Sequence, residues 1–499
     1  MTGWGGGYVT DIQYMPGWYR HQSPAILSIA CLLGNVQSPL PQGDDPVSYL
    51  ELGCGQGYGA MLLAASNPNW RVTAVDYNPA HIATARDWAA EAGLDNVSFL
   101  EADLSTLAES DAARAIPEAD FVSMHGVWSW VPPAVQDGIV RLLAAKVRPG
   151  GVVHVSYNSL PGWGSAVGMQ RLLLDVGRRA AARSDRQVEE ALKVLSALYD
   201  AQAVHLVGSP MVRSLRERFD SMPVAYLAHE YMNQHWRPCF MADVANKLAD
   251  AKLEFVGSAQ LPENFPDLTL NDRQRAVVQN HDDPLLRELI KDHCLERQLR
   301  HDVYVRGARR IATPARDAAL MDLHLNLSIP PDELPLDAEM PAGRAELAKE
   351  FYQPIAQALR DGPRRVKDLL ALPDVEGRRD NPAELVGVLI GLAFAEPASR
   401  PAAGPGAAAQ RFNRCMMQRR LPLEPLGTPV GIASERLGTG MHTALCDLLV
   451  MERLQAGDAD VDAMLRELAE HTLDPDRLRE ALERSMRVRM PLLRAAGLL

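Results

Sequence analysis

Apolar runs typical of buried strands alternate with helical patterns over the first third of the chain. Because parallel neighbours need a crossover connection, such alternation is typical of a parallel sheet covered by helices. Pro79 and Gly93 mark the start and end of the clearest helix, since proline suits a first turn and glycine ends a helix. The pattern therefore predicts an α/β sheet domain. Its expected strands are Val47–Glu51, Arg71–Asp76, Val97–Leu100, Asp120–Met124 and Gly151–Tyr157.

The pattern changes after Trp163. Long helical stretches rich in alanine, leucine and arginine continue to about Leu206 without strand-like alternation. A short strand-like run, Leu253–Val256, follows, and Ser328–Pro341 has the proline-rich and acidic composition of a linker. We therefore predict three domains: a sheet domain over residues 1–165, a helical middle domain over residues 166–330 and a helical C-terminal domain over residues 331–499.

Three helical stretches fill residues 345–397 of the C-terminal domain: Ala345–Asp361, Val366–Ala371 and Pro382–Ala393. They fit a small winged-helix-like unit, and a plain helical bundle fits them equally well. The arginine pairs Arg364–Arg365 and Arg378–Arg379 would support contact with DNA through this unit, although exposed arginines are usually only solvated.

Composition mainly excludes classes of protein. The six cysteines are scattered without a Cys-x-x-Cys pair, and no histidines stand at ligand spacing along the sequence, so we expect no disulfide framework and no metal site. The chain has neither a basic start leading into an apolar run nor about 18 uninterrupted apolar residues, which predicts a cytoplasmic protein without membrane insertion. The net charge of −12 argues against nucleic acid as the main partner.

The most informative stretch runs from a predicted strand directly into a glycine-rich turn, ELGCGQGY at residues 51–58. Its three glycines lack the Cβ atoms that would block a ligand, so a cofactor can lie against bare backbone. A dinucleotide fingerprint needs its third glycine at position 58, where this chain has Tyr58, and a carboxylate at Glu51 suits a cation better than a pyrophosphate. S-adenosylmethionine (AdoMet), which carries an amino group and a sulfonium, fits this turn. The expected cofactor-binding residues here are Glu51, Gly53, Cys54, Gly55, Gly57 and Tyr58.

Two further acidic residues follow the second and third strands. Asp76, about twenty residues after the glycine turn, stands where a carboxylate can accept hydrogen bonds from both ribose hydroxyls, next to Tyr77 and Asn78. Asp103 can accept a hydrogen bond from the adenine amine while Leu104 packs on the ring; a helix N-cap is the alternative role for Asp103. These positions extend the expected cofactor site.

Aromatic and polar residues follow the fourth and fifth strands. In an open α/β sheet the binding crevice lies beyond the carboxyl ends of the strands, so His125, Gly126 and Trp128 should border it. Trp128 can face the sulfonium or pack beneath the cofactor, and His125 fits binding or positioning better than proton transfer. Tyr157 emerges at the same crevice, and Tyr14 belongs to an aromatic lead that could fold over the cofactor as a lid.

The ordered set of Glu51, the three glycines, Asp76 and Asp103 resembles the class I AdoMet-dependent methyltransferases over roughly residues 45–160. The resemblance implies a seven-stranded, mostly parallel, Rossmann-like sheet. Flanking motifs resemble, more narrowly, bacterial methyltransferases with an appended methyltransferase regulatory domain, a group that includes rickettsial protein-lysine methyltransferases. These motifs stand at Ser23–Leu27, His125–Trp128, Tyr157–Trp163, His229–Tyr231 and Trp236–Pro238.

The narrower resemblance implies a homodimer, a regulatory and dimerisation role for residues 166–330 and a protein lysine as acceptor, although Trp18–His21 departs from the pattern of the lysine-modifying members. Methyl transfer to lysine is an in-line displacement, so the enzyme mainly aligns a deprotonated amine. Two alternatives stay open: a small-molecule or sugar methyltransferase, and a non-catalytic AdoMet-sensing regulator. Expected catalytic residues are Tyr14, His125, Tyr157 and Tyr231, and Asn158, Tyr226, His229 and Glu230 can also orient the amine.

Overall fold

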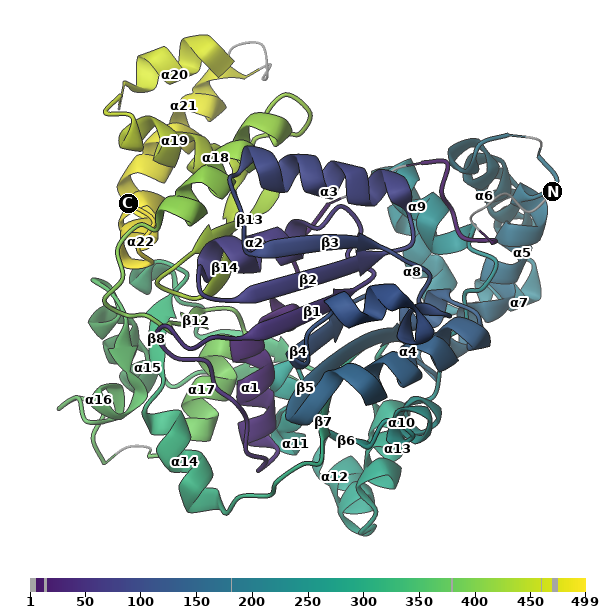
Figure 1. Cartoon of the computed structure of the whole chain (residues 1–499), viewed down its shortest axis with the longest axis horizontal. Helices are drawn as coiled ribbons and strands as arrows, with labels where there is room; N and C mark the ends of the chain where they lie inside the picture. Colours follow the sequence, from purple (N-terminus) through teal and green to yellow (C-terminus); the bar gives the residue numbers. More distant parts are fainter. Residues whose placement is uncertain (1–5, 13–15, 181, 378–379, 459, 469–473) are drawn as a thin grey trace.

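A computed structural model describes residues 6–12, 16–180, 182–377, 380–458, 460–468 and 474–499. At its centre lies one seven-stranded sheet (Figure 1). Its strands are β1 (Ser48–Leu52), β2 (Arg71–Asp76), β3 (Val97–Glu101), β4 (Ala119–Met124), β5 (Val147–Asn158), β6 (Leu253–Ser258) and β7 (Leu299–Arg306). They lie in the order β3-β2-β1-β4-β5-β7-β6. β1 to β5 are parallel, whereas β7 is antiparallel to both of its neighbours. The predicted Rossmann-like sheet is confirmed.

The last two strands of the sheet come from far downstream in the sequence. β6 and β7 follow a long helical segment and lie outside residues 1–165, yet they extend the sheet that β1 to β5 begin. The division into domains 1–165, 166–330 and 331–499 stays a prediction, and the sheet itself draws on the first two of these segments.

Helices cover both faces of the sheet. α1 (Pro24–Leu33), α2 (Tyr58–Ser66) and α3 (Pro79–Glu91) pack on one face, and α4 (Pro133–Lys146) and α10 (Met241–Ala249) pack on the other. Tyr49 and Leu50, neighbours on β1, belong to different cores, because successive side chains of a strand point to opposite faces.

A helical unit with a core of its own follows β5. It contains α5 (Val167–Gly177), α6 (Ser184–Asp200), α7 (Val204–Val207), α8 (Pro210–Arg218) and α9 (Val224–Tyr231), and it lies on the right in Figure 1. Leu173, Val188 and Leu195 are buried in its core, and Val9 of the N-terminal segment joins them. The N-terminal segment therefore packs against this helical unit.

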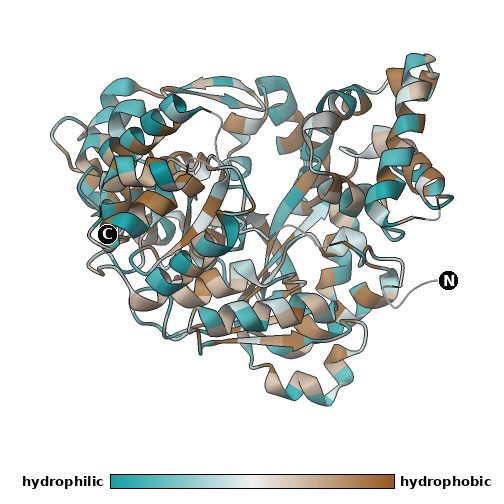
Figure 2. Ribbon diagram, turned by 90° about the horizontal axis from the view of Figure 1, so that it is seen from above, coloured by the Kyte–Doolittle hydropathy of each residue, from teal (hydrophilic) through white to brown (hydrophobic). Residues whose placement is uncertain are grey.

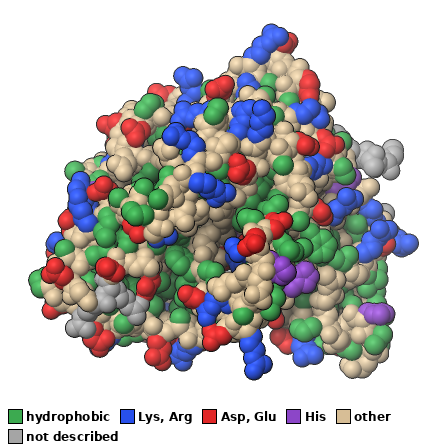
Figure 3. Space-filling model, turned by 90° about the horizontal axis from the view of Figure 1, so that it is seen from below, with side chains coloured by type: hydrophobic (Ala, Val, Ile, Leu, Met, Phe, Trp, Pro, Cys, Tyr) green, Lys and Arg blue, Asp and Glu red, His purple; other side chains and the backbone are tan. Residues whose placement is uncertain are grey.

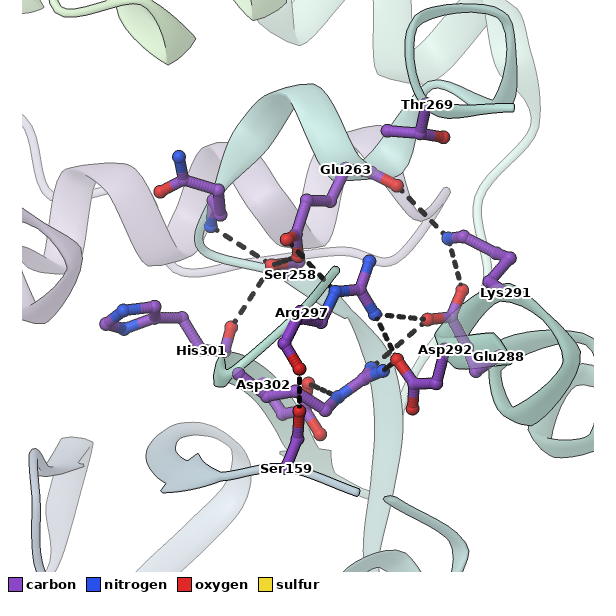
Figure 4. Close-up of polar contacts among 12 residues, drawn as sticks. Ser159, Ser258, Glu263, Thr269, Glu288, Lys291, Asp292, Arg297, His301 and Asp302 are labelled. Atoms are coloured by element: carbon purple, nitrogen blue, oxygen red, sulfur yellow. Dashed lines mark hydrogen bonds and ion pairs between the residues drawn. The ribbon is translucent and has the colours of Figure 1, made fainter. Parts of the chain in front are cut away.

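A buried network of ion pairs anchors β7. The Arg300 guanidinium lies 2.6 Å from Asp292, 2.8 Å from Asp302 and 3.1 Å from Glu288, and Arg297 lies 2.7 Å from the same Asp292. These side chains converge from β7, from α13 (Pro284–Cys294) and from the segment between them (Figure 4). Buried charges are tolerated only when paired in this way, so the network fixes β7 in the sheet. Two shorter helices, α11 (Pro266–Thr269) and α12 (Asp272–Gln279), precede α13.

The C-terminal half contains a small mixed unit. The three helices predicted within residues 345–397 are α15 (Lys349–Ala358), α16 (Val366–Leu370) and α17 (Pro382–Gly391). A three-stranded sheet accompanies them, with β8 (His324–Leu327) between β11 (Arg364–Arg365) and β12 (Ala395–Pro397). The unit also contains α14 (Thr313–Met321) and a hairpin of β9 (Asp337–Met340) and β10 (Gly343–Glu346). The segment expected to be a linker, Ser328–Pro341, therefore contains part of this hairpin.

The last part of the chain covers α2. The hairpin of β13 (Pro429–Ser434) and β14 (Thr439–Ala444) contacts it, and the Tyr58 hydroxyl donates a hydrogen bond to the Gly431 carbonyl at 2.7 Å. The surrounding helices lie at the upper left of Figure 1. They are α18 (Ala407–Arg420), α19 (Leu445–Gln455), α20 (Val461–Leu468), α21 (Pro475–Arg484) and α22 (Met490–Ala495).

The outer surface is that of a mixed-charge protein. The outer helices carry hydrophilic and hydrophobic residues together (Figure 2), as helices with one buried side do. Basic and acidic side chains are interspersed over the face seen from below (Figure 3). Among the described residues, no helix is both long and apolar enough to span a bilayer.

Candidate functional site

The glycine-rich turn joins β1 to α2, and its three glycines adopt left-handed backbone angles. Gly53, Gly55 and Gly57 have φ values of 74°, 54° and 75°, which side-chain-bearing residues rarely adopt. A Cβ at Gly53 would overlap Val127, and one at Gly57 would overlap the Phe99 ring. A Cβ at Gly55, in contrast, would meet no atom within 4 Å. Packing explains two of the glycines, whereas Gly55 presents bare backbone to open space.

Asp76 faces this turn from the end of β2. Its Oδ2 accepts a hydrogen bond from the Gly55 N–H at 2.8 Å, and its Oδ1 accepts one from the Asn78 N–H at 2.9 Å. Asn78 caps α3 through the Ala80 N–H, and Tyr77 is exposed. The carboxylate therefore stands beside the bare backbone, where the sequence predicts a ribose contact.

Glu51 lies beneath the turn and is buried. Its Oε1 accepts a hydrogen bond from the Gln22 amide at 3.0 Å, while its Oε2 has no hydrogen-bond partner among the described residues. Burial raises the pKa of Glu51 to about 7, and the Gln22 hydrogen bond offsets part of this rise. A buried carboxylate oxygen without a partner, next to open backbone at Gly55, fits a cationic nucleoside such as AdoMet.

Several predicted cofactor residues are packed inside the protein. Leu104 and Trp128 belong to the core between the sheet and α4, and Cys54 is buried, which raises the pKa of its thiol well above the usual value. Tyr58 points to the β13–β14 hairpin. Packing accounts for these buried side chains. Asp103 is exposed, and its Oδ1 accepts a hydrogen bond from the Ser105 N–H at 2.8 Å, within a turn that precedes η2 (Leu107–Glu109), so it is not the N-cap of a helix. Contact of any of these residues with the cofactor stays a prediction.

The N-terminal segment covers the crevice. The ring of Tyr19 stacks on that of His125 with centroids 3.9 Å apart. Tyr8 belongs to the same segment, and its ring centroid lies 6.1 Å from that of His229. Burial of the Tyr8 hydroxyl raises its pKa, and the nearby Asp76 carboxylate adds to this rise. Tyr14, a predicted catalytic residue, lies outside the described residues. The described parts of the segment are placed as a lid would be.

Arg20 attaches this lid to the C-terminal half. Its guanidinium donates to both carboxylate oxygens of Glu396 on β12 at 3.0 Å, and also to the Ile390 carbonyl at 2.8 Å. Trp18 packs against the His442 ring, with centroids 4.9 Å apart. The departure from the lysine-modifying pattern at Trp18–His21 therefore coincides with contacts to the C-terminal half.

A row of polar side chains crosses the sheet under the lid, here called the polar stripe. The register of the strands explains this row. Glu51 on β1 pairs with Ser123 on β4, and Ser123 pairs with His154 on β5. Ser156, also on β5, pairs with His301 on β7. Paired residues face the same side of a sheet, so these side chains form one row. The polar stripe consists of Glu51, Ser123, His125, His154, Ser156 and His301.

The histidines of the polar stripe are uncharged at neutral pH. Burial, followed by the neighbouring His21, lowers the pKa of His125 to about 3. Burial likewise lowers the pKa values of His154 and His301 well below the usual value. His125 is thus a poor proton donor at neutral pH, in keeping with a positional role.

Two predicted catalytic tyrosines, Tyr157 and Tyr231, are buried. Tyr157 is buried on the opposite face of the sheet, where its hydroxyl donates to Asp302 Oδ2 at 2.5 Å. Tyr231 lies in the core of the helical unit, edge-on to Phe219. The Tyr157 hydroxyl therefore faces away from the polar stripe, and a catalytic role for either tyrosine stays an untested prediction.

Glu230 on α9 comes close to the crevice. It lies beside Asn158, at the carboxyl end of β5, and beside Tyr226, which also lies within electrostatic range of Tyr19. Burial raises the pKa of Glu230 to about 7, and the Asn158 side chain offsets part of this rise. We call Tyr19, Asn158, Tyr226 and Glu230 the Glu230 cluster.

Three residues of this region, His154, His301 and Gln22, are not predicted as site residues from the sequence. The sequence does contain a pattern that indicates His154. Two mostly apolar strands each carry two polar residues at alternate positions: Ser123 and His125 in one, His154 and Ser156 in the other. Alternating polar positions in a strand that should be buried mark a polar row on one face of the sheet. His301 and Gln22 gave no such signal, because tertiary structure alone brings them to the row.

Comparison with known proteins agrees with this geometry. A methyltransferase domain model matches residues 50–151, and a model described as a predicted methyltransferase regulatory domain matches residues 223–306. An uncharacterized Synechocystis protein, sll1526, is 31% identical over 460 residues, which cover 91% of this chain and 89% of that protein. The chain is a class I AdoMet-dependent methyltransferase with a methyltransferase regulatory domain.

Other relatives of the methyltransferase are rickettsial. The uncharacterized protein RP028 of Rickettsia prowazekii is 25% identical over 228 residues, which cover 45% of this chain and 86% of that protein. The structure of PKMT2 from Rickettsia typhi in complex with AdoHcy has a TM-score of 0.69 at 18% identity, over 97% of this chain and 99% of that one. The methyltransferase therefore shares its fold over nearly its whole length.

The regulatory-domain match has a structural consequence for the methyltransferase. Residues 223–306 contain α9 as well as β6 and β7. This region therefore supplies both Glu230 and His301, and it completes the sheet that carries the candidate cofactor site.

Proposed function

We propose that the methyltransferase transfers the methyl group of AdoMet to the side-chain amine of a lysine in a protein. The observation that carries this proposal is the position of the half-buried Glu230 carboxylate beside Asn158, at the carboxyl end of β5, together with its pKa near 7. A lysine ammonium has no lone pair, so the transfer requires a group that takes its proton. A carboxylate that is half-ionised near neutral pH suits that role.

The glycine turn and the Glu230 cluster supply the interactions with the cofactor and the acceptor. Bound AdoMet presents an electrophilic methyl group, and Gly55, Asp76 and Glu51 are the residues that would hold it. Glu230 would accept the ammonium proton, while the Asn158 amide orients the nitrogen. The faces of Tyr19 and Tyr226 can attract the cation before it loses that proton. Tyr226 is 39% exposed, so an acceptor can reach it from the surface.

Two observations favour a protein acceptor. The flanking motifs resemble those of protein-lysine methyltransferases, and Tyr226 and Glu230 come from α9 of the helical unit, while the glycine turn and Asp76 come from the sheet. We also propose that residues 1–165, 166–330 and 331–499 act as AdoMet-binding, acceptor-binding and covering parts of a homodimer. Light scattering on the purified chain tests the dimer.

The packing of α17 bears on the DNA-binding alternative. Its residues Pro382 to Ile390 are mostly buried, with Gly387 against Phe265 and Gly391 against Pro262. A recognition helix must be exposed to enter a DNA groove. Arg364 and Arg365 are exposed, whereas Arg378 and Arg379 lie outside the described residues.

Tritiated AdoMet tests the acceptor. The purified enzyme is incubated with dialysed lysate protein and, separately, with the small-molecule fraction, and labelled protein is digested to locate the methyl group by mass spectrometry. The proposal predicts label on lysine Nζ with the wild type and loss of it with Glu230→Gln, while Glu217→Gln, an exposed substitution on α8, retains activity. Label confined to the small-molecule fraction would overturn the protein acceptor.

A further inference from the structure

Three histidines of the polar stripe converge from three neighbouring strands. His154 lies on β5, His301 on β7, and His125 directly follows β4. One ring nitrogen of each lies within 4.8 Å of the others, and the His154 Nε2 to His301 Nδ1 distance is 3.3 Å. Figure 4 shows the His301 ring pointing away from Asp302 and its ion-pair network. The cluster thus lies on the lid side of the sheet, apart from the buried charges behind it.

Serine hydroxyls hold two of these rings from behind. Ser156 Oγ lies 3.0 Å from His125 Nδ1, and Ser123 Oγ lies 3.0 Å from His154 Nδ1. When Nδ1–H donates to a hydroxyl, the lone pair of the imidazole is on Nε2, the nitrogen that faces the cluster. Such contacts to the outer nitrogen orient the histidine ligands of metal sites. The rings are therefore oriented before any ligand arrives.

The spacing matches one kind of ligand. Nitrogens bound at about 2.0–2.1 Å to a tetrahedral zinc ion lie about 3.3 Å from one another, as His154 and His301 already do. The His125 ligand atom lies within 4.8 Å of the other two, and a small side-chain rotation would bring it to the same distance. Imidazole nitrogens select zinc and similar transition metals, whereas magnesium and calcium require oxygen ligands.

We propose that His125, His154 and His301 form a binding site for one divalent transition-metal ion of the zinc class. Three protein ligands leave the fourth position open, as in catalytic zinc sites. That position faces the lid, where Tyr19 stacks on His125 and His21 stacks on His301 with ring centroids 4.1 Å apart. The site adjoins the cofactor site, because Ser123 and Gln22 link His154 to Glu51.

Cobalt(II) is the probe, because its visible spectrum reports tetrahedral coordination. The full-length protein is stripped with a chelator, dialysed and titrated with cobalt(II), and zinc(II) is then added in competition. The proposal predicts one cobalt per chain with an intense visible band, displaced by one zinc. His301→Gln and His154→Gln each weaken binding at least about 10-fold, and Ser123→Ala weakens it less. The control His205→Gln, at an exposed position on α7, binds as the wild type does.

Circular dichroism and AdoMet binding show whether each variant is folded. Where substitution of the fully buried His154 or His301 prevents folding, His125→Asn, at a half-buried position, supplies the same test. Absence of a stoichiometric cobalt band from the wild type overturns the proposal. Binding that persists in folded His301→Gln and His125→Asn also overturns it, because the metal is then adventitious. None of these measurements involves methyl transfer, so the result is independent of the proposed acceptor.

Discussion

The Oδ2 atom of Asp76 accepts a hydrogen bond from the backbone N–H of Gly55 at 2.8 Å. The contact joins the end of β2 to the one glycine of the turn whose missing Cβ is not explained by packing. A carboxylate and bare backbone thus lie together where a nucleoside can contact both. In our proposal this pair forms the cofactor end of the site, and the Glu230 cluster forms the acceptor end.

Gly55→Ala should impair AdoMet binding more than folding. The added Cβ meets no protein atom, so the stability loss is the left-handed backbone strain of about 1–2 kcal/mol, but the methyl group projects toward the ligand. We expect a decrease in AdoMet affinity of at least about 10-fold by calorimetry. Gly150→Ala is the matched control. Gly150 also has a left-handed backbone, with φ of 81°, and a Cβ there would meet no atom within 4 Å. It lies near the amino end of β5, at the edge of the sheet opposite the candidate site. Equal AdoMet affinities in the two variants would contradict the assignment.

AdoMet binding should release protons below neutral pH. Burial raises the pKa of Glu51 to about 7 in the free protein, so the carboxyl is mostly protonated at about pH 6. A cationic ligand favours the ionised form, which means that binding expels the proton and affinity rises with pH up to about 7. Calorimetry in two buffers of different ionisation enthalpy measures the release. Glu51→Gln should abolish it, and proton uptake by the wild type would show that the sign is wrong.

The pH dependence of methyl transfer should report Glu230. Because its pKa is raised to about 7, the carboxylate form that accepts a proton increases as the pH rises through this value. The rate constant kcat/KM for the protein acceptor should therefore rise through about pH 7. Glu230→Gln should remove this step and lower the rate roughly 100-fold with AdoMet affinity unchanged. A Glu230→Gln profile that keeps the same step would assign the ionisation to another group.

The pair of Arg20 and Glu396 should stabilise the closed lid. Both side chains are largely buried, so Arg20→Ala leaves Glu396 buried without its cation and should cost about 3 kcal/mol in urea unfolding. Arg484→Ala removes an ion pair to Glu333 whose side chains are 49% and 44% exposed, and should cost less than about 1 kcal/mol. Similar losses in both variants would mean that Arg20 contributes no more than a surface contact.

Much of the sheet could be predicted because its first five strands are local patterns. Apolar runs bounded by turns identify β1 to β5, and the glycine turn and Asp76 follow directly from them. β7 escaped prediction for a physical reason: its sequence LRHDVYVR contains Arg300 and Asp302, which look like surface residues until α13 supplies the counterions that allow their burial.

The candidate site was predictable in its cofactor half and much less in its acceptor half. The cofactor half is built from residues that follow consecutive strands, so order along the chain places them. The three-histidine cluster depends instead on the antiparallel register of β5 and β7, which brings together His154 and His301 from positions 147 apart in sequence. Tyr157 was expected at the crevice, but the alternation of β5 turns it to the face opposite His154 and Ser156.

Titration calorimetry of AdoMet into the pure protein tests the central claim, that the cofactor lies on the bare backbone of the glycine turn against Asp76. The account predicts saturable binding of one AdoMet per chain to the wild type, no heat with NAD⁺, and at least about 10-fold weaker AdoMet binding to Asp76→Ala. Unchanged AdoMet affinity in a folded Asp76→Ala protein, or binding of NAD⁺ in place of AdoMet, would contradict it.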